Sequence, residues 1–240
     1  MPVHRLSRRL AFPHPSLAEP DGLLAVGGDL SLERLVLAYS CGIFPWYSDP
    51  EPVLWWSPDP RFVLFPDQLR VGRTLRRTLR RAPHRLTADT AFDEVVARCA
   101  SVRRPGQRGT WITAAMRQAY GEAHRHGIAH SVEAWAGERL VGGAYGLEIG
   151  RAFCGESMFA LEPDASKVAF VHLVRFVRRR GALLVDCQME TEHLARFGAV
   201  AVPREDFLER LGRAVEAGIS AGSWTEPFAE ALPHLAEEEP

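Results

Sequence analysis

The chain has 240 residues, of which 46% are hydrophobic and 25% are charged, and its formal net charge at pH 7 is −1. Such values are typical of an ordinary soluble globular protein with one large or two modest domains. No apolar run approaches the roughly 20 residues of a membrane span, and the start of the chain lacks the apolar stretch of a secretory signal. We therefore expect a cytoplasmic protein with no membrane partner.

The first sixty residues contain one clear helical pattern, which Ser31 is expected to cap and which places Leu35 and Tyr39 on one side. Around it lie Gly-Gly and Pro-rich turns. We interpret residues 1–65 as a small accessory domain with Pro- and Trp-rich loops, and residues 66–240 as a separate domain.

Three of the six tryptophans lie between residues 42 and 61, together with five prolines that interrupt both helices and strands. Each of Trp46, Trp55 and Trp56 could fill a small loop-rich core. Three together, followed by an arginine-dense stretch, favour a surface where aromatic rings contact a polyanion that carries bases.

The arginine-dense stretch runs from Gln68 to Thr87 and holds seven arginines and no acidic residue, so the rest of the chain carries the compensating negative charge. A thin apolar stripe through Leu75 and Leu79 predicts an amphipathic helix over residues 71–82, ended by Pro83. Its arginines repel one another unless an anion binds, so we expect this helix to contact phosphate, with a solvated basic face as the alternative.

The pattern becomes regular after residue 61. It predicts a strand at 61–65, a strand at 84–87, a helix from about 91, and a helix from Thr113 to about 126. A three-stranded antiparallel meander at 131–135, 139–149 and 152–158 is followed by a helix at 165–180, a strand at 183–188, a short helix capped by Thr191, and a helix at 204–217. This order predicts an α+β fold with a mixed, mainly antiparallel sheet flanked by helices, as in acyltransferases of the GNAT type.

Two further features carry negative expectations. The four cysteines and the group His124, His126 and His130 lack the spacing of a metal site, so we expect buried free thiols, a solvated histidine face and no metal. The acidic, proline-containing tail beyond about Ser220 is expected to be a loose end.

Nine strings of the sequence are distinctive enough to indicate a family. They are Glu-Pro-Asp-Gly-Leu-Leu-Ala-Val-Gly-Gly-Asp-Leu from Glu19, Gly-Ile-Phe-Pro-Trp from Gly42, Leu-Trp-Trp-Ser-Pro-Asp-Pro-Arg from Leu54, Gly-Thr-Trp-Ile-Thr from Gly109, Ala-His-Ser-Val-Glu from Ala129, Leu-Val-Gly-Gly from Leu140, Cys-Gly-Glu-Ser-Met-Phe from Cys154, Ala-Ser-Lys from Ala165 and Val-Asp-Cys-Gln from Val185. On these strings, over about residues 10 to 210, the chain resembles the bacterial leucyl/phenylalanyl-tRNA–protein transferases. The resemblance implies transfer of Leu or Phe, less readily Met, from aminoacyl-tRNA to a protein with an N-terminal Arg or Lys, which marks that protein for degradation.

The resemblance assigns catalysis to Asp186 and Gln188, which a regular strand would point to one side, into a cleft. Aminoacyl-tRNA is an activated ester, so an attacking amine needs alignment and a proton acceptor but no cofactor. An amide oxygen is a poor base, so we expect Gln188 to orient the amine. Glu156, on the neighbouring strand, is the third candidate, as a carboxylate either for the acceptor's amine or for its basic side chain. We expect it and Asp186 to balance the two positive charges of the acceptor, with an ion pair to arginine as the structural alternative for each.

The resemblance also implies binding residues. Phe153, Met158, Phe170 and Val185 would line a pocket for the donor side chain, although each suits an ordinary core. Relatives carry a larger apolar residue at the position of Ala144, so we expect a roomier or repacked pocket. Trp46 and Trp111 would contact the terminal adenosine. For tRNA phosphate we nominate Arg76, Arg77, Arg80 and Arg81, with Arg103, Arg104 and Arg108 as a second patch.

Two other functions fit part of the sequence. A CoA-dependent GNAT acetyltransferase would share the order of elements, but the chain has no Gln/Arg-x-x-Gly-x-Gly/Ala loop for pyrophosphate. A non-catalytic RNA-binding module would explain the arginines and tryptophans, yet it would leave Asp186, Gln188 and Glu156 without a purpose.

Overall fold

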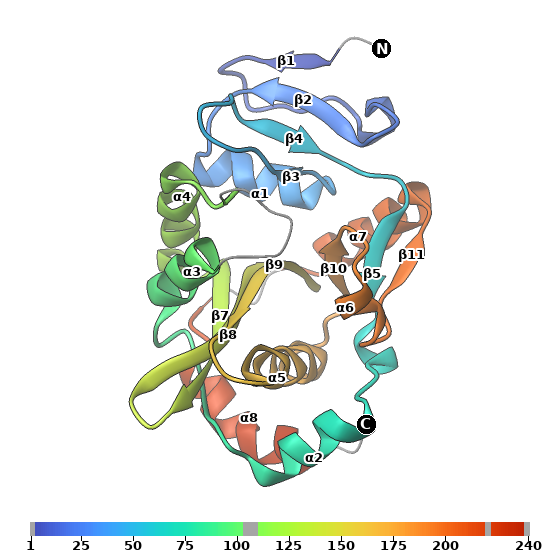
Figure 1. Ribbon diagram of the computed structural model, residues 1–240. Helices are drawn as coiled ribbons and strands as arrows, with labels where there is room; N and C mark the ends of the chain where they lie inside the picture. The colour runs from blue at the N-terminus through green and yellow to red at the C-terminus, as the bar shows by residue number, and fades with distance from the viewer. Residues whose placement is uncertain (1–2, 103–109, 219–221, 238–240) are drawn as a thin grey trace.

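The computed structural model describes residues 3–102, 110–218 and 222–237, which form two β-sheets and their covering helices (Figure 1). The smaller sheet has the strand order β1-β2-β4-β3 and is formed by the N-terminal residues. Its strands are β1 (His4–Leu6), β2 (Leu23–Gly27), β3 (Phe44–Pro45) and β4 (Leu54–Trp56), and helix α1 spans Leu32–Ser40. The predicted N-terminal helix is confirmed, but Ser31 makes no side-chain cap and instead donates its hydroxyl to Asp29.

The larger sheet has the strand order β11-β5-β10-β9-β8-β7-β6, and its only parallel pair among the described residues is β9 with β10. The predicted mixed, mainly antiparallel sheet is therefore confirmed. Its strands are β5 (Arg61–Leu64), β6 (Arg85–Ala88), β7 (Ala129–Ala136), β8 (Arg139–Ile149), β9 (Ala152–Ala160), β10 (Leu184–Gln188) and β11 (Val200–Val202).

Helices cover both faces of this sheet, which makes the fold α+β as predicted. On one face α5 packs against β7, β8 and β9 and is itself contacted by α2 and α8, while α1, α3 and α4 cover the other face (Figure 1). The helices are α2 (Arg73–Arg81), α3 (Phe92–Ser101), α4 (Ala114–Arg125), α5 (Ala165–Arg179), α6 (Glu192–Ala195), α7 (Arg204–Glu216) and α8 (Thr225–Glu237), with short 3-10 turns at Pro15–Leu17 and Pro66–Gln68. Thr113 and Thr191 cap α4 and α6 through their hydroxyls, as the sequence predicts.

The division between the sheets does not fall at residue 65. Strand β5, at Arg61–Leu64, pairs with β10 and β11 and so belongs to the larger sheet. The N-terminal part also shares a core with the rest of the chain, because Leu35 and Trp55 lie in the same apolar cluster as Val95 and Leu147. Sequence periodicity marks the strand but cannot say which sheet it joins.

The expectation of a loose C-terminal tail is wrong for residues 222–237. Helix α8 packs against α5 and β6, and the side chains of Trp224, Phe228 and Leu235 are fully buried. Trp224 stacks on the ring of His130, which is also buried, so His130 does not belong to a solvated histidine face. The prolines and acids of the tail concealed the helical spacing of its apolar residues.

Two local features of the meander shape the site. Gly142 lies under the start of α5, where a β-carbon would come within 2.6 Å of Ala165, so close approach explains this glycine. Strand β9 carries an extra residue, because Tyr145 pairs with Ser157 while Gly146 pairs with Gly155. The bulge at Glu156 reverses the alternation of side chains along the strand. No helix among the described residues is both long and apolar enough to cross a membrane.

Candidate active site

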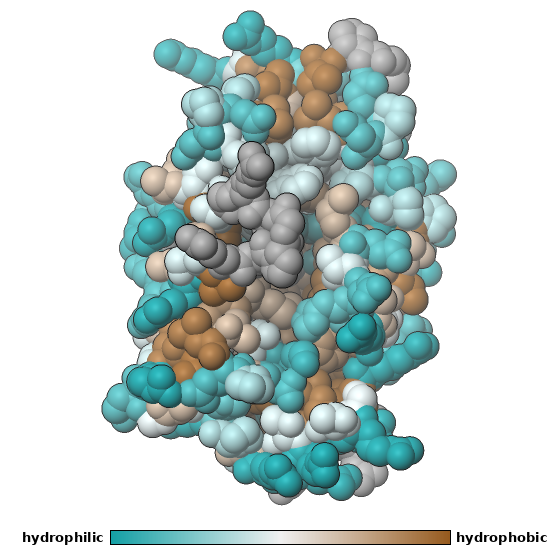
Figure 2. Space-filling model, in the orientation of Figure 1, coloured by the Kyte–Doolittle hydropathy of each residue, from teal (hydrophilic) through white to brown (hydrophobic). Residues whose placement is uncertain are grey.

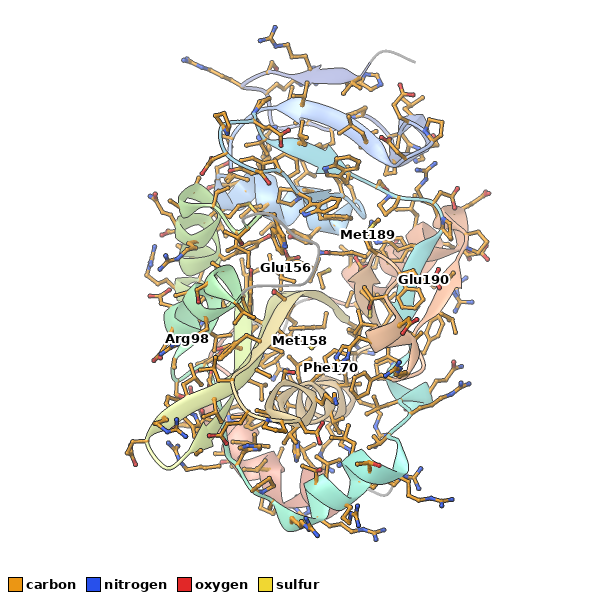
Figure 3. All side chains as sticks on the ribbon, viewed as in Figure 1. Arg98, Glu156, Met158, Phe170, Met189 and Glu190 are labelled. Carbon is orange, nitrogen blue, oxygen red and sulfur yellow. The ribbon has the colours of Figure 1, made fainter. Side chains whose placement is uncertain are left out.

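The site lies where two parallel strands separate. Strands β9 and β10 pair over three residues each: the first pair is Ala152 with Leu184, and the last is Cys154 with Asp186. Residues 155–158 are consequently partly exposed, although β9 lies inside the sheet. Figure 2 shows apolar and weakly polar side chains at the centre of this face of the molecule, between hydrophilic margins. In Figure 3, Glu156, Met158 and Phe170 lie near the middle of the view, with Met189 and Glu190 beyond the end of β10.

Glu156 is held at this opening by three neutral donors. The hydroxyl of Tyr39 donates to Oε1 and that of Tyr120 to Oε2, both at 2.7 Å, and the Gln188 amide donates to Oε1 at 2.7 Å. Removal of water by the surrounding protein raises the pKa of Glu156 to about 7, although these hydrogen bonds favour the ionised form. Glu156 can therefore take up and release a proton near neutral pH.

Asp186 is a buried partner of an arginine. It is 1% exposed, and Arg61 donates to both carboxylate oxygens, from Nε at 2.8 Å and from Nη2 at 2.6 Å. The prediction that Asp186 offers a free carboxylate to the cleft is therefore wrong, and the ion-pair alternative describes its position. Since Arg61 compensates its charge, Glu156 is the only uncompensated carboxylate of the cluster formed by Arg61, Asp186, Gln188, Glu156, Tyr39 and Tyr120.

Gln188 does not continue the regular strand. The register of β10 against β5 shifts between Asp186 and Gln188, and Gln188 has a φ of 62°, in the left-handed region. Its backbone N–H donates to Asp186 Oδ1 at 2.9 Å, while its side chain reaches Glu156. The side chain of Asp186 therefore pairs with Arg61, whereas that of Gln188 binds Glu156. The expectation that both side chains point to one side of a regular strand does not hold here.

The bulge in β9 separates the proposed catalytic and donor-binding residues. Glu156 contacts tyrosines from α1 and α4, whereas Met158 packs against the cluster beneath α5 that also contains Phe170, Ala144 and Val185. Ala144 pairs with Met158 across β8 and β9. Met158 is partly exposed while Ala144, Phe170 and Val185 are buried, so only Met158 of these opens toward solvent.

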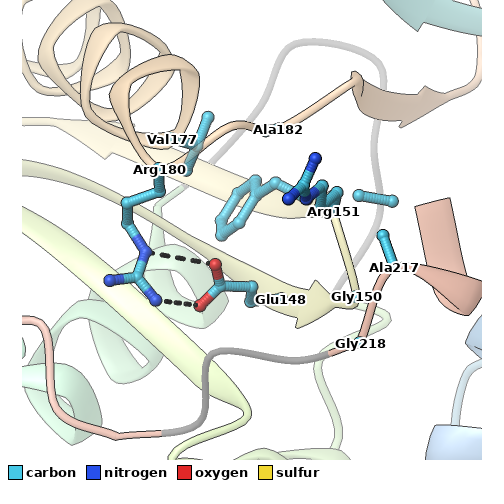
Figure 4. A pocket seen from close by; sticks show the side chains of 10 residues that line it. Glu148, Gly150, Arg151, Val177, Arg180, Ala182, Ala217 and Gly218 are labelled. Atoms are coloured by element: carbon cyan, nitrogen blue, oxygen red, sulfur yellow. Dashed lines mark hydrogen bonds and ion pairs between the residues drawn. The ribbon is translucent and has the colours of Figure 1, made fainter.

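Phe153 belongs to the same apolar cluster as Met158, Phe170, Ala144 and Val185, and it pairs with Val185 across β9 and β10. It lines a cavity of about 240 Å³ between the start of β9 and the C-terminal end of α5, where Arg180 forms an ion pair with Glu148 (Figure 4). Its ring lies 5.6 Å from that of Trp224. Phe153 and Met158 are five residues apart on β9, so they lie at opposite ends of this cluster.

The tryptophans divide into core and surface. Trp55 is fully buried and its indole donates to Gly27 O, so for this residue the core alternative holds. Trp46 is 40% exposed. The ring of Trp56 packs edge-on against it, with 5.7 Å between the ring centres, and the Trp56 indole N–H donates to the backbone carbonyl of Trp46. The segment of Trp111 lies beside that of Trp46, because the hydroxyls of Tyr47 and Thr113 are 3.1 Å apart.

Helix α2 presents its arginines to solvent, as the sequence predicts. Leu75 is buried and Leu79 half-buried, while Arg76, Arg77, Arg80 and Arg81 are exposed. Arg73, Arg76, Arg77 and Arg80 border an open groove of about 450 Å³. The helix lies at the end of the molecule opposite the N-terminal sheet (Figure 1). Arg103, Arg104 and Arg108 lie outside the described residues.

Sequence reasoning did not assign Tyr39, Tyr120 or Arg61 to the site. Tyr39 lies on the inward side of a predicted helix and Arg61 ends one of the distinctive strings, but only the tertiary structure brings them to Glu156 and Asp186. Cys99, Cys154 and Cys187 are buried free thiols and Cys41 is half-buried. Within the described part of the chain no three Cys, His, Asp or Glu residues are grouped as metal ligands.

A carboxylate that titrates near neutral pH, hydrogen-bonded to an amide at the opening of an α+β sheet, suits an enzyme that transfers an acyl group to an amine. Two family models match the chain: the leucyl/phenylalanyl-tRNA protein transferase over residues 63–212, and its N-terminal domain over residues 28–59. Their boundary coincides with the division between the two sheets.

Curated relatives from the same family align with almost the whole chain. Leucyl/phenylalanyl-tRNA–protein transferases from Anaeromyxobacter dehalogenans (strain 2CP-C) and Myxococcus xanthus are 61% and 56% identical, covering 93% and 95% of this chain and 96% and 99% of theirs. A solved structure, L-PGS from Bacillus licheniformis, covers 68% of this chain and 55% of its own, with 11% identity and a TM-score of 0.38, too low to assign a shared fold. The chain belongs to the leucyl/phenylalanyl-tRNA–protein transferase family and is an aminoacyltransferase.

Proposed function

We propose that this protein acts in the cytoplasm, transferring Leu or Phe, and less readily Met, from aminoacyl-tRNA to the N-terminal Arg or Lys of an acceptor protein. The new N-terminal residue then marks the acceptor for N-degron-dependent proteolysis. The observation that carries this proposal is the Glu156–Gln188 hydrogen bond at the opening between β9 and β10, in a chain of this family.

The hydrogen bonds assign roles to this pair. Because the Gln188 amide nitrogen donates to Glu156, its carbonyl oxygen is free to accept a hydrogen bond from the incoming amine. The amine then lies beside Glu156, whose pKa of about 7 suits a proton acceptor. The amine nitrogen attacks the ester carbonyl and the bond to the ribose oxygen breaks. Glu156 takes a proton from the attacking nitrogen and passes it on to the ribose oxygen, which leaves as the free hydroxyl of the tRNA.

The tRNA would be held at two places. Trp46 and Trp111 stack on the terminal adenosine, which contributes about 1–3 kcal/mol per base and tolerates any base. The α2 arginines contact the acceptor-stem phosphates, with affinity that falls as salt rises. We further propose that the larger sheet is of the GNAT type, since its β9 and β10 pair in parallel and then separate, and that the residues before Arg61 form the accessory domain that carries Trp46.

Incubation with tRNA charged with labelled Phe and a peptide that begins with Arg tests the function. Transfer of label to the peptide amine supports it. Acetylation that depends on acetyl-CoA would favour the acetyltransferase, and tRNA binding without transfer would favour an RNA-binding module.

Substitution at Ala144 tests the donor pocket. Ala144→Met is expected to reduce transfer of Phe relative to Leu by about 10-fold, because the longer side chain fills space beside Met158. Competition between Phe, Leu and Met donors measures the effect. Ala134→Met, at a fully buried position on the neighbouring strand β7, controls for overpacking and should leave the ratio unchanged. Unchanged preferences in Ala144→Met itself would refute the link to the pocket.

The arginine helix is tested by its salt dependence. Arg77→Gln with Arg80→Gln is expected to lower the slope of log affinity for tRNA against log salt by about 1.5, because each lost phosphate contact removes about 0.7–0.9. Filter binding between 50 and 300 mM salt, roughly the range in which phosphate contacts dominate, gives the slope. Arg196→Gln, which removes an exposed arginine paired with Glu192 on α6, is the control. Equal slopes for all three proteins would exclude α2 from the interface.

A further inference from the structure

Arg61 is a charged residue enclosed by the fold. It is 1% exposed, and its guanidinium carbon lies 4.7 Å from the ring centres of both Phe44 and Phe207. Its Nε and Nη2 donate to Asp186, and its Nη1 donates to the carbonyl of Gly42 at 3.1 Å. Stacking on the rings and hydrogen bonds along the edge fix the planar group in one orientation.

The partners of Arg61 belong to the two halves of the proposed site. Gly42 and Phe44 lie in the Gly-Ile-Phe-Pro-Trp segment that ends at Trp46, the proposed contact for adenosine, and Phe44 lies on β3. Asp186 accepts from the Gln188 backbone N–H through the same Oδ1 that accepts from Arg61 Nε. That bond holds Gln188 in its left-handed conformation, which a residue with a side chain rarely adopts.

We infer that Arg61 is a positioning residue that fixes the distance between the adenosine contact at Trp46 and the amide of Gln188. This inference rests on the proposed function. Arg61 touches no substrate; it joins β3 of the N-terminal sheet to β10 of the larger sheet. An ester attached to the stacked adenosine therefore meets the amine that Gln188 orients, and a displacement of about 1 Å would lower the rate about 100-fold.

Arg61→Lys tests the inference, because lysine keeps the charge but cannot make the forked and stacked contacts. We expect kcat to fall about 100-fold while KM for aminoacyl-tRNA changes less than about 2-fold, since stacking and phosphate contacts remain. Arg34→Lys is the matched control, because Arg34 is also 1% exposed, pairs with Asp29 and donates to backbone carbonyls, but lies in the N-terminal part. It should lose thermal stability and keep kcat.

A double-mutant cycle with Gln188→Ala separates positioning from general destabilisation. If Arg61 acts through Gln188, Arg61→Lys has no further effect on the single-turnover rate once Gln188 is alanine. Independent, multiplying effects would overturn the inference, as would an equal loss of kcat in Arg34→Lys. If Arg61→Lys does not fold, Phe44→Leu replaces it in the cycle, because this variant removes one of the rings stacked on Arg61. The single-turnover rate is then expected to fall about 10-fold. Failure of the proposed function itself would appear as absent transfer in the wild type.

Discussion

Glu156→Gln is expected to lower the transfer rate by about 10²–10⁴-fold, because it removes the proposed proton acceptor while keeping the shape of the side chain. The pKa of Glu156 is about 7 against an ordinary value of 4.5. In the wild type kcat/KM should therefore rise with pH through about 7, whereas the variant should keep only the later rise that comes from loss of the proton from the acceptor's α-amine near pH ~8. A flat wild-type profile between about pH 6 and pH 8, roughly one unit on each side of that pKa, would contradict the role.

The same substitution should stabilise the protein at alkaline pH. Because burial raises the pKa of Glu156, the folded state binds the proton more tightly than the unfolded state. The favourable contribution is complete below the unfolded value of 4.5 and is lost as the pH rises through about 7. Above that pH the ionised carboxylate lowers the free energy of unfolding by at most about 3 kcal/mol. The loss is smaller than this limit because the side chain is partly exposed to solvent. Urea unfolding at pH 5 and pH 8 should show a gain for Glu156→Gln that is much larger at pH 8.

Glu133→Gln is the control for Glu156→Gln. Glu133 is fully buried, burial also raises its pKa, and it accepts hydrogen bonds from Ser131, Thr87 and Thr90 away from the opening. It should alter the pH dependence of stability without altering the transfer rate. A comparable loss of rate in Glu133→Gln would show that the effect at Glu156 is structural.

Asp186→Leu is expected to destabilise the fold by about 3–5 kcal/mol, because it leaves the guanidinium of Arg61 buried without its carboxylate. For a chain of this size that corresponds to a fall in Tm of about 6–20 °C. Adding Arg61→Met removes the second charge and should restore most of the stability. Transfer should stay low in the double variant, because the Gln188 N–H has lost its acceptor. Calorimetry and the label-transfer assay measure the two properties separately.

Asp29→Leu is the comparison for this experiment. Asp29 also pairs with a buried arginine, but its own side chain is 54% exposed and water can replace it. The loss should be about 1 kcal/mol or less. If Asp186→Leu cost no more than Asp29→Leu, the buried pair would not be a major source of stability.

The sequence predicted the elements well and their assembly less well. The apolar spacing of residues 92–99 and the threonine caps at 113 and 191 are local signals, and the structure confirms them. The sheet that residues 61–64 join depends on pairing with β10 and β11, which no local pattern encodes. The C-terminal helix depends on burial of Trp224 and Phe228, which outweighs the proline inside it.

The site shows the same division. The resemblance selected Asp186 and Gln188, the expected neighbouring strand added Glu156, and the structure places all three in one hydrogen-bonded cluster. Arg61 neutralises the charge of Asp186 and so changes the charge balance of the cluster. These two residues are 125 positions apart in the sequence, so no local pattern reveals their pairing. Strand alternation failed at Glu156 and Gln188 because a bulge and a left-handed residue interrupt the strands there.

The extra residue in β9 has an evolutionary consequence. Glu156 and Met158 lie two positions apart, yet they contact groups on opposite sides of the sheet. If the apolar residues under α5 line the donor pocket, as we propose, changes there can alter which amino acid is donated and leave the proposed proton acceptor Glu156 in place. Deleting one residue from the bulge would bring both tasks to a single side, and every later change in preference would then disturb the chemistry as well.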